Sequence, residues 1–485
     1  MKLDWRSVIH VLGMLLMING AFMFFCLPAT FYYHTADLLP ILLSGAITVG
    51  TGFMAWILNR PSERPNIRKR EAFIIVTLGW IVLSVSGALP YLLSGSIRTF
   101  TDAFFETMSG YTTTGASTIV NLDIIAPDIL LWRSVTHWIG GMGIIVLAVA
   151  ILPILGIGGM QLFVAEAPGI TTDKISPRIT DTAKRLWLIY VGLTVAQIVA
   201  LRLAGMSMFD ALNHSFATIA TGGFGTHNDS IASFSPLIQY IIAFFMAAAG
   251  VNFILYYFAL KGKVLRSIKD EELRFYILAI ALFTLISSIT VLRVTDMGVE
   301  EAFRHSLFSV ISLMTSTGFA TADYTLWGPA MNLMYFLLLF SGAMAGSTTG
   351  SIKIVRHVVL MKNMILELRR QLHPSAILPV RLNGRALPQD IANQVTTFVM
   401  VYIIIWAICS MLVAFTGVEV TTSMSAVATC MGGVGPGIGD VGPATNFEKL
   451  PDIATWILSF AMLVGRLELF TVLILFTPYF WRSRG

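Results

Sequence analysis

Ten apolar runs of about twenty residues constrain this chain more than any other feature of its sequence. A run of that length crosses about 30 Å of hydrocarbon as a helix, because backbone inside a bilayer must satisfy its own hydrogen bonds. Only 12% of the 485 residues are charged, against about a quarter in a soluble domain. We therefore predict a polytopic membrane protein with spans at residues 8–32, 38–58, 71–93, 129–155, 186–203, 236–260, 273–292, 330–359, 395–415 and 453–480.

A Thr- and Gly-rich loop recurs four times between these runs, at residues 112–118, 220–226, 315–321 and, in degraded form, 432–437. Each copy follows a short helical stretch of about ten to fourteen residues, too short to cross a membrane. Such a loop cannot bury a core alone, so four copies in equivalent settings indicate four-fold packing around one axis. The alternative for any single copy is a turn or a close-packed crossing of small residues.

The predicted fold is therefore an all-α polytopic membrane protein. It has four helix–pore-loop–helix repeats around a pseudo-four-fold pore, preceded by two N-terminal transmembrane helices. The third repeat includes an interrupted second helix and a cytoplasmic loop. The predicted units are residues 1–65 for the two-helix extension and 66–182, 183–268, 269–390 and 391–485 for the four repeats.

Most of the 32 Lys and Arg residues fall in alternate connections, as the positive-inside rule predicts for cytoplasmic segments. Both termini are then cytoplasmic, and the pore loops enter from the outer side. The loops contain no Lys, Arg or carboxylate ring. Glycine lets backbone carbonyls approach an axis, and carbonyl rings replace the hydration shell of a cation. The loops therefore predict a path for a monovalent cation.

With Thr-Thr-Gly, Thr-Gly-Gly-Phe, Ser-Thr-Gly-Phe and Gly-Val-Gly-Pro in the loops, the chain resembles the Trk/Ktr/HKT superfamily of potassium transporters, and its bacterial TrkH/TrkG branch in particular. The resemblance covers essentially the whole chain and implies a glycine-anchored filter at Gly115, Gly223, Gly318 and Gly435. The fourth loop lacks a Thr before its glycine, which leaves its register open. The implied K⁺-binding filter residues are Thr112, Thr113, Thr114, Gly115, Ala220, Thr221, Gly222, Gly223, Thr315, Ser316, Thr317, Gly318, Gly432, Gly433, Val434 and Gly435.

A run of small and polar residues, 342–351, interrupts the apolar span of the third repeat and predicts a helix break. The resemblance makes this run an intramembrane gate below the filter, and it places Arg466 in the pore beside that gate. The alternatives are a close-packed helix crossing for the run and a salt bridge or carbonyl cap between helices for Arg466. The implied gate residues are Gly346, Ser347, Thr348, Thr349, Gly350, Lys353 and Arg466.

Potassium uptake across the bacterial inner membrane is the function that this resemblance implies, with K⁺ and Rb⁺ as ions and Na⁺ left open. It also implies a homodimer and a cytosolic nucleotide-binding regulatory subunit of the TrkA type, docked on cytoplasmic segments such as residues 355–388. We expect no cofactor, no nucleic-acid partner and no enzymatic activity. The alternative is a Na⁺- or H⁺-coupled symporter or a Na⁺ transporter, but Asp102, Asp210 and Glu301 begin short helices, where helix dipoles explain them.

Overall fold

The computed structural model describes residues 3–33, 38–61, 67–143, 179–373, 375–376 and 378–482, with the backbone alone described at 179–182 and 266. The second half of the expected span 129–155, and basic residues such as Lys174 and Arg178, lie outside these ranges. The boundaries of the five predicted units stay a prediction.

Helices make up most of the described residues, and two strands of two residues each form an antiparallel pair. The N-terminal elements are α1 (Trp5–Phe24), α2 (Leu27–Tyr33) and α3 (Leu38–Leu58). The first repeat contains α4 (Lys69–Gly87), α5 (Leu89–Ser94), α6 (Phe100–Tyr111), η1 (Leu122–Ile124) and α7 (Pro127–Gly141). The second contains α10 (Ile179–Leu203), α11 (Met208–Ile219), α12 (Pro236–Ala249), α13 (Phe253–Leu260) and α14 (Val264–Ile268).

The third repeat contains α15 (Glu271–Val294), α16 (Val299–Met314), η2 (Tyr324–Trp327), α17 (Pro329–Leu338), α18 (Ile354–Leu372), β1 (Arg381–Leu382) and β2 (Arg385–Ala386). The fourth contains α19 (Gln389–Ala414), α20 (Val420–Gly432), η3 (Gly439–Val441), α21 (Asp452–Arg466), α22 (Phe470–Leu473), η4 (Ile474–Phe476) and α23 (Pro478–Trp481).

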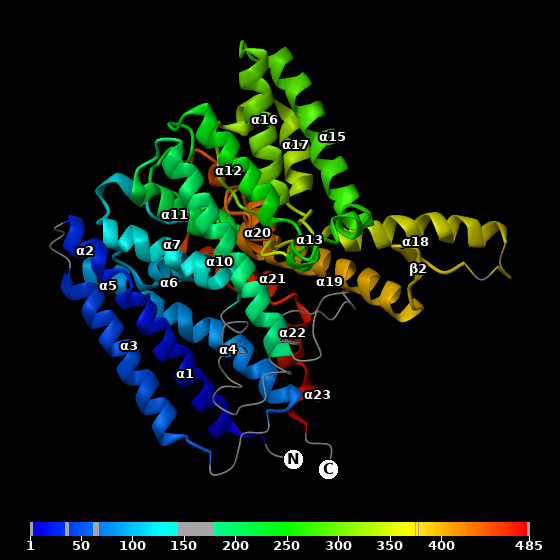
Figure 1. Ribbon diagram of the computed structural model, residues 1–485. Coiled ribbons are helices and arrows are strands. Elements are labelled where there is room, and N and C mark those ends of the chain that lie inside the picture. The colour runs from blue at the N-terminus through cyan, green and yellow to red at the C-terminus, as the bar shows by residue number, and fades with distance from the viewer. Residues whose placement is uncertain are drawn as a thin grey trace.

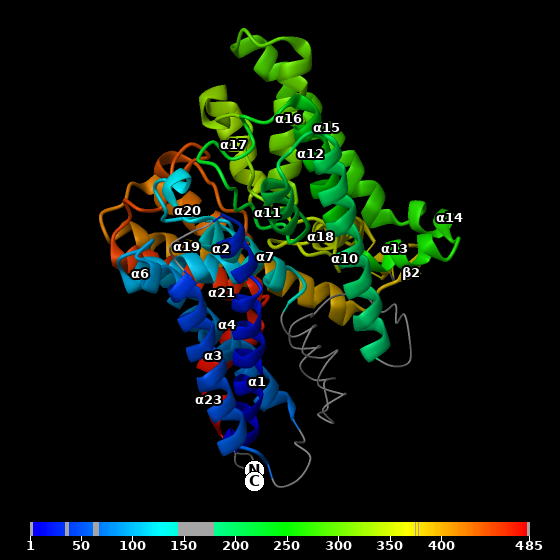
Figure 2. The ribbon, with the colours of Figure 1, turned by 60° about the vertical axis from the view of Figure 1, so that its left-hand side comes forward.

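Helices α1 and α3 lie side by side along one edge of the molecule (Figures 1 and 2). Their contact depends on glycine: a Cβ at Gly13 would lie 2.6 Å from the Gly52 carbonyl oxygen, and one at Gly52 would lie 2.7 Å from the Gly13 oxygen. Small residues allow this approach where lipid supplies no hydrophobic drive for helix association. The pair forms the predicted two-helix extension.

Six helices of the described chain are long and apolar enough to cross a membrane, or eight if two bent helix pairs each form one span. The spans expected at 236–260 and 453–480 are each bent. α12 and α13 meet at 94°, and α21 meets the α22–η4 segment at 110°. In the first case the Asn252 side chain accepts a hydrogen bond from the Ile254 amide and starts a new helix. In the second, Glu468 and Leu469 adopt positive φ, which ends α21.

The two ends of the described chain lie on one side of the molecule. Near the start of α1 the Asp4 amide donates to Glu71 at the start of α4, and Arg70 donates to the carbonyl of Arg482. At the opposite end, Thr30 of α2 donates to Asp128 at the start of α7. Since α4 leads from the first side and α7 starts at the second, α6 and its loop dip into the protein from the side opposite the chain ends.

Candidate functional site

Four short helices lead into the four Thr- and Gly-rich loops: α6, α11 and α16 end directly before their loops, and α20 ends at Gly432, the first residue of the fourth. Three begin with a side-chain cap: Thr99, Ser207 and Glu419 accept hydrogen bonds from backbone amides three residues ahead. The C-terminus of a helix carries a partial negative charge. Four such ends therefore surround the loops with a potential that favours cations.

We call residues 112–115, 220–223, 315–318 and 432–435 loops 1 to 4. In each loop the second and fourth residues adopt positive φ. The second residues are Thr113 (56°), Thr221 (54°), Ser316 (50°) and Gly433 (66°). The fourth residues are Gly115 (80°), Gly223 (80°), Gly318 (82°) and Gly435 (92°). This shared conformation fixes the register that the sequence left open, and it pairs Gly435 with Gly115.

The fourth-position glycines bring the loops together head to tail. A Cβ built on Gly115 would lie 2.1 Å from the Gly222 carbonyl oxygen, and the next two steps repeat this: 1.9 Å from Gly223 to the Thr317 oxygen and 1.8 Å from Gly318 to the Val434 oxygen. A Cβ on Gly435 would lie 2.8 Å from the Thr114 oxygen, which returns to loop 1. The four loops form a closed ring in which each glycine fits against a carbonyl of the next loop.

The interrupted segment of the third repeat lies against this ring. We call Gly346, Ser347, Thr348, Thr349 and Gly350 the gate loop. Thr348 donates to the carbonyl of Ile219, directly before loop 2, and the Gly350 amide donates to the Ser316 hydroxyl of loop 3 at 2.7 Å. A Cβ on Gly350 would lie 2.3 Å from the Gly432 oxygen of loop 4. The helix break predicted here is present, since α17 ends at Leu338 and α18 begins at Ile354.

Arg466, the last residue of α21, joins the gate loop to loop 1. Its guanidinium donates to the Thr113 hydroxyl at 3.1 Å and to the Thr348 carbonyl at 3.0 Å. It also donates to the carbonyl of Gly140 at the end of α7. The carbonyl cap that the sequence offered as one alternative is therefore present, while the pore position of Arg466 stays a prediction. Glu468, two residues after Arg466, pairs with Arg356.

Lys353 stabilises the gate loop from its C-terminal side. Its ammonium group donates to the carbonyl and the hydroxyl of Thr349, and it is 9% exposed. Lys353 therefore supplies hydrogen bonds to two Thr349 oxygens that would otherwise be buried without a donor. The seven residues predicted for the gate are thus brought together, although their role in gating stays a prediction.

Glu272 was missed by the sequence reasoning. One of its carboxylate oxygens accepts the backbone amides of Ala345, at 2.7 Å, and Val355, at 3.1 Å. These residues flank the gate loop on both sides, so Glu272 holds its two ends together. The only sequence signal was an acidic residue at the start of an apolar span. Such a residue is also common in the first turn of a helix, where the helix dipole favours a negative charge, so the signal was ambiguous.

The sequence model of the TrkH family, described as a cation transport protein, matches residues 39–483. The chain belongs to the TrkH family. The Trk system potassium uptake protein TrkH of Escherichia coli K12 is 42% identical over 492 residues, covering 99% of this chain and 100% of the relative. The protein of the same name from Halomonas elongata is 40% identical over 482 residues, covering 99% of each chain.

A solved structure agrees with this placement in the TrkH family. The crystal structure of the potassium transporter TrkH from Vibrio parahaemolyticus superposes with a TM-score of 0.89 at 38% identity, covering 99% of this chain and 100% of that one. The predicted resemblance and the helical, polytopic membrane fold are confirmed. The family comprises transport proteins, so the expectation that the chain is not an enzyme is also confirmed.

Proposed function

We propose that this TrkH-family protein takes up K⁺ across the bacterial inner membrane through the ring of loops 1 to 4. The observation that carries the proposal is the closed head-to-tail ring of glycines and carbonyls. Carbonyl rings substitute for the hydration shell of K⁺. The relatives in Escherichia coli and Halomonas elongata are named as potassium uptake proteins, which supports K⁺ as the ion.

The chemistry of the ring suits a monovalent cation. Its sixteen residues carry no charged side chain, and the four helix ends around it supply partial negative charge without a full carboxylate. K⁺ and Rb⁺ bind the sixteen filter residues through backbone carbonyls, with Thr hydroxyls as additional ligands. One fourth-position glycine per loop makes fewer well-defined sites than a longer filter, so Na⁺ is excluded incompletely.

The gate loop obstructs the path in this proposal. It contacts loops 2, 3 and 4 directly and loop 1 through Arg466. The positive charge of Arg466 beside the ring raises the barrier to cations, since an unscreened charge at membrane depth acts over several ångströms. Conduction requires the gate loop to withdraw from the ring.

Channel-like permeation is favoured over symport with Na⁺ or H⁺. A coupled symporter needs a second ion site, normally built on a carboxylate inside the membrane. Protein groups hold the buried carboxylates of the described helices and the half-buried Glu468: Glu106 pairs with Arg133, Glu468 pairs with Arg356, Glu272 accepts two backbone amides, Asp128 accepts the Thr30 hydroxyl and the Ile129 amide, and Glu71 accepts the Asp4 amide.

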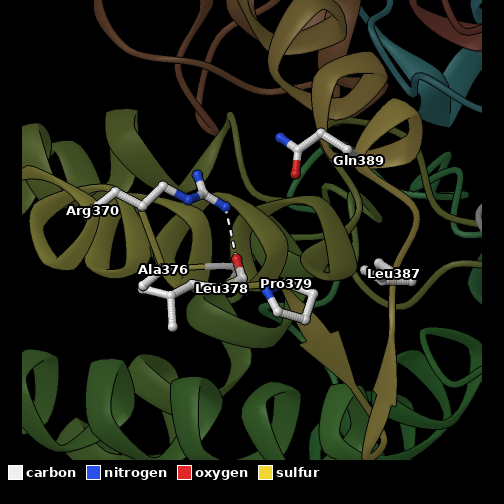
Figure 3. Close-up of a pocket in the computed structure, with 6 residues that line it drawn as sticks. All are labelled: Arg370, Ala376, Leu378, Pro379, Leu387 and Gln389. Atoms are coloured by element: carbon white, nitrogen blue, oxygen red, sulfur yellow. Dashed lines mark hydrogen bonds between the residues drawn. The ribbon is translucent and has the colours of Figure 1, made fainter. Parts of the chain in front are cut away.

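The proposed cytoplasmic partner surface is α18 and the β1–β2 hairpin, which project away from the helical bundle (Figure 1). Helix α18 exposes an apolar stripe of Met361, Met364, Ile365, Leu368 and Leu372. Near its end a pocket of about 410 Å³ lies beside Arg370, which donates to the Leu378 carbonyl at 2.8 Å (Figure 3). We assign this surface to a nucleotide-binding regulatory subunit of the TrkA type, with nucleotide on the partner and the transporter itself a homodimer whose termini are cytoplasmic.

Flux of radioactive Rb⁺ into proteoliposomes containing the purified protein tests the proposal, with K⁺, Na⁺ and Li⁺ as competitors. We expect K⁺ to compete better than Na⁺ and deletion of Gly346 to Gly350 to raise the flux. Flux that requires an imposed Na⁺ or H⁺ gradient would replace channel-like uptake by coupled symport. Flux that neither the deletion nor Gly318→Ser alters would exclude this ring as the ion path.

A further inference from the structure

A buried ion pair joins helices α6 and α7 of the first repeat, next to loop 1 of the ring. The Arg133 Nε of α7 lies 2.6 Å from a Glu106 carboxylate oxygen of α6, and the two side chains are 3% and 0% exposed. Taking two charges out of water costs several kcal/mol per ion, so a buried pair is weak evidence of stabilisation. The role of the Glu106–Arg133 pair therefore has to be inferred from its other contacts.

Glu106 holds the outer end of loop 1. One carboxylate oxygen accepts the Ser117 hydroxyl at 3.0 Å, and the other accepts the Thr118 amide at 2.9 Å. Ser117 and Thr118 follow the ring residue Gly115 by two and three positions. The carboxylate therefore fixes the backbone immediately outside the ring glycine.

Arg133 holds the outer end of loop 2. It donates to the Gly225 carbonyl at 2.9 Å, two residues beyond Gly223, and its guanidinium carbon lies 3.6 Å from the centre of the Phe224 ring. His137, one turn further along α7, stacks on the same Phe224 ring at 3.9 Å between centroids. A planar guanidinium can bond a carboxylate and a carbonyl at once and stack on an aromatic face, which a Lys cannot do.

The ion pair therefore bridges loops 1 and 2 across the position where Gly115 fits against the Gly222 carbonyl. The shared register shows how this junction differs from the other three. Six residues before each loop, Glu106 is matched by His214, Ser309 and Ala426. None of these is a carboxylate, and His214 instead hydrogen-bonds Thr226. One junction of the ring has an ionic brace that its three counterparts lack at this position.

We propose that the Glu106–Arg133 pair is a selectivity-determining brace that fixes the width of the ring between loops 1 and 2. The inference rests on the proposed function, because it concerns the ion path assigned above. Discrimination between K⁺ and the smaller Na⁺ depends on how far coordinating carbonyls can close in. A charge-assisted, multiply bonded support limits that movement more than neutral contacts do.

The test replaces both charges together, because removing one partner leaves an uncompensated buried charge that can prevent folding. The double variant Glu106→Met with Arg133→Met keeps the side-chain volume roughly and removes every bond to Ser117, Thr118 and Gly225. We expect Rb⁺ flux to persist, while the preference for K⁺ over Na⁺ as competitor falls about tenfold, equal to about 1.4 kcal/mol of differential binding. Arg133→Lys, which retains the charge and loses the bridge, should give an intermediate preference.

The matched control is the Arg356–Glu468 pair, which is also largely buried and whose guanidinium also lies over an aromatic ring, that of Phe398 at 3.8 Å. Its double Met variant should keep the wild-type K⁺/Na⁺ preference. If the wild-type protein prefers K⁺ over Na⁺, and the double Met variant and Arg133→Lys both keep that preference, the proposed brace is overturned and the proposed function is not. A wild-type protein without any preference for K⁺ overturns the proposed function as well.

Discussion

Alanine at the four ring glycines should damage selectivity unequally, although the four positions share one conformation. Gly318 and Gly435 have φ of 82° and 92°, so alanine at either position incurs similar backbone strain of about 1–2 kcal/mol. Their surroundings differ. A Cβ on Gly318 would lie 1.8 Å from the Val434 oxygen, whereas one on Gly435 would lie 2.8 Å from its nearest atom.

The size of the disturbance follows from these distances. Real Cβ atoms essentially never approach a neighbour below 3.0 Å, so the Val434 carbonyl must retreat by about 1.2 Å to admit alanine at 318, and the Thr114 carbonyl by only about 0.2 Å to admit it at 435. A carbonyl displaced by more than 1 Å no longer coordinates an ion in the ring. We expect Gly318→Ala to lower the K⁺/Na⁺ preference about tenfold or more and Gly435→Ala by less than about threefold.

Competition by K⁺ and Na⁺ against Rb⁺ flux in proteoliposomes measures this difference. Gly417→Ala is the matched control, because Gly417 has φ of 93° and no atom within 4 Å of its Cβ position. It should carry the backbone strain without any change in selectivity. Equal losses in Gly318→Ala and Gly435→Ala, both folded, would refute the reasoning from carbonyl displacement.

Three further substitutions test the parts around the ring. Arg466→Ala removes the link between the gate loop and loop 1 and should raise Rb⁺ flux about tenfold, with Arg466→Lys intermediate; unchanged flux in the Ala variant would contradict the gate. Gly222→Ala places a Cβ 2.3 Å from the His137 ring and should lower the K⁺/Na⁺ preference, and His137→Ala should partly restore it in the double variant if that collision is the cause. Glu272→Leu should make the gate leaky, whereas Glu272→Gln, which keeps an acceptor oxygen for both amides, should conduct like the wild type; equal flux in the two would exclude the clamp.

The repeated loops and the helix break in the third repeat could be predicted from sequence because each has a local signal. Thr and Gly recur at four equivalent places, and small polar residues interrupt one apolar run. The register of loop 4 could not be predicted, since Gly432, Gly433 and Gly435 are equally permissive and only the positive φ of the last two distinguishes them.

The bends after α12 and α21 were missed for a different reason. Hydropathy averages over a window and does not respond to a short polar interruption such as Asn252. Glu106 and Arg133 are 27 residues apart in the chain, and their pairing depends on how α6 packs against α7. The sequence alone gives no sign that Arg133 is buried and paired.

Because the chain is synthesised from its N-terminus, the closed ring can form only after the fourth loop has been made. Gly318 fits against Val434, and Gly435 fits against Thr114, so two of the four junctions need the last loop to be synthesised. Arg466, which ties the gate loop to loop 1, comes later still. A nascent chain with three loops can form only two of the four junctions, so under the proposed function it lacks a closed ion path. Under the proposed function, the ion path therefore closes only when the final quarter of the chain is inserted, and incomplete chains offer no such path through the membrane.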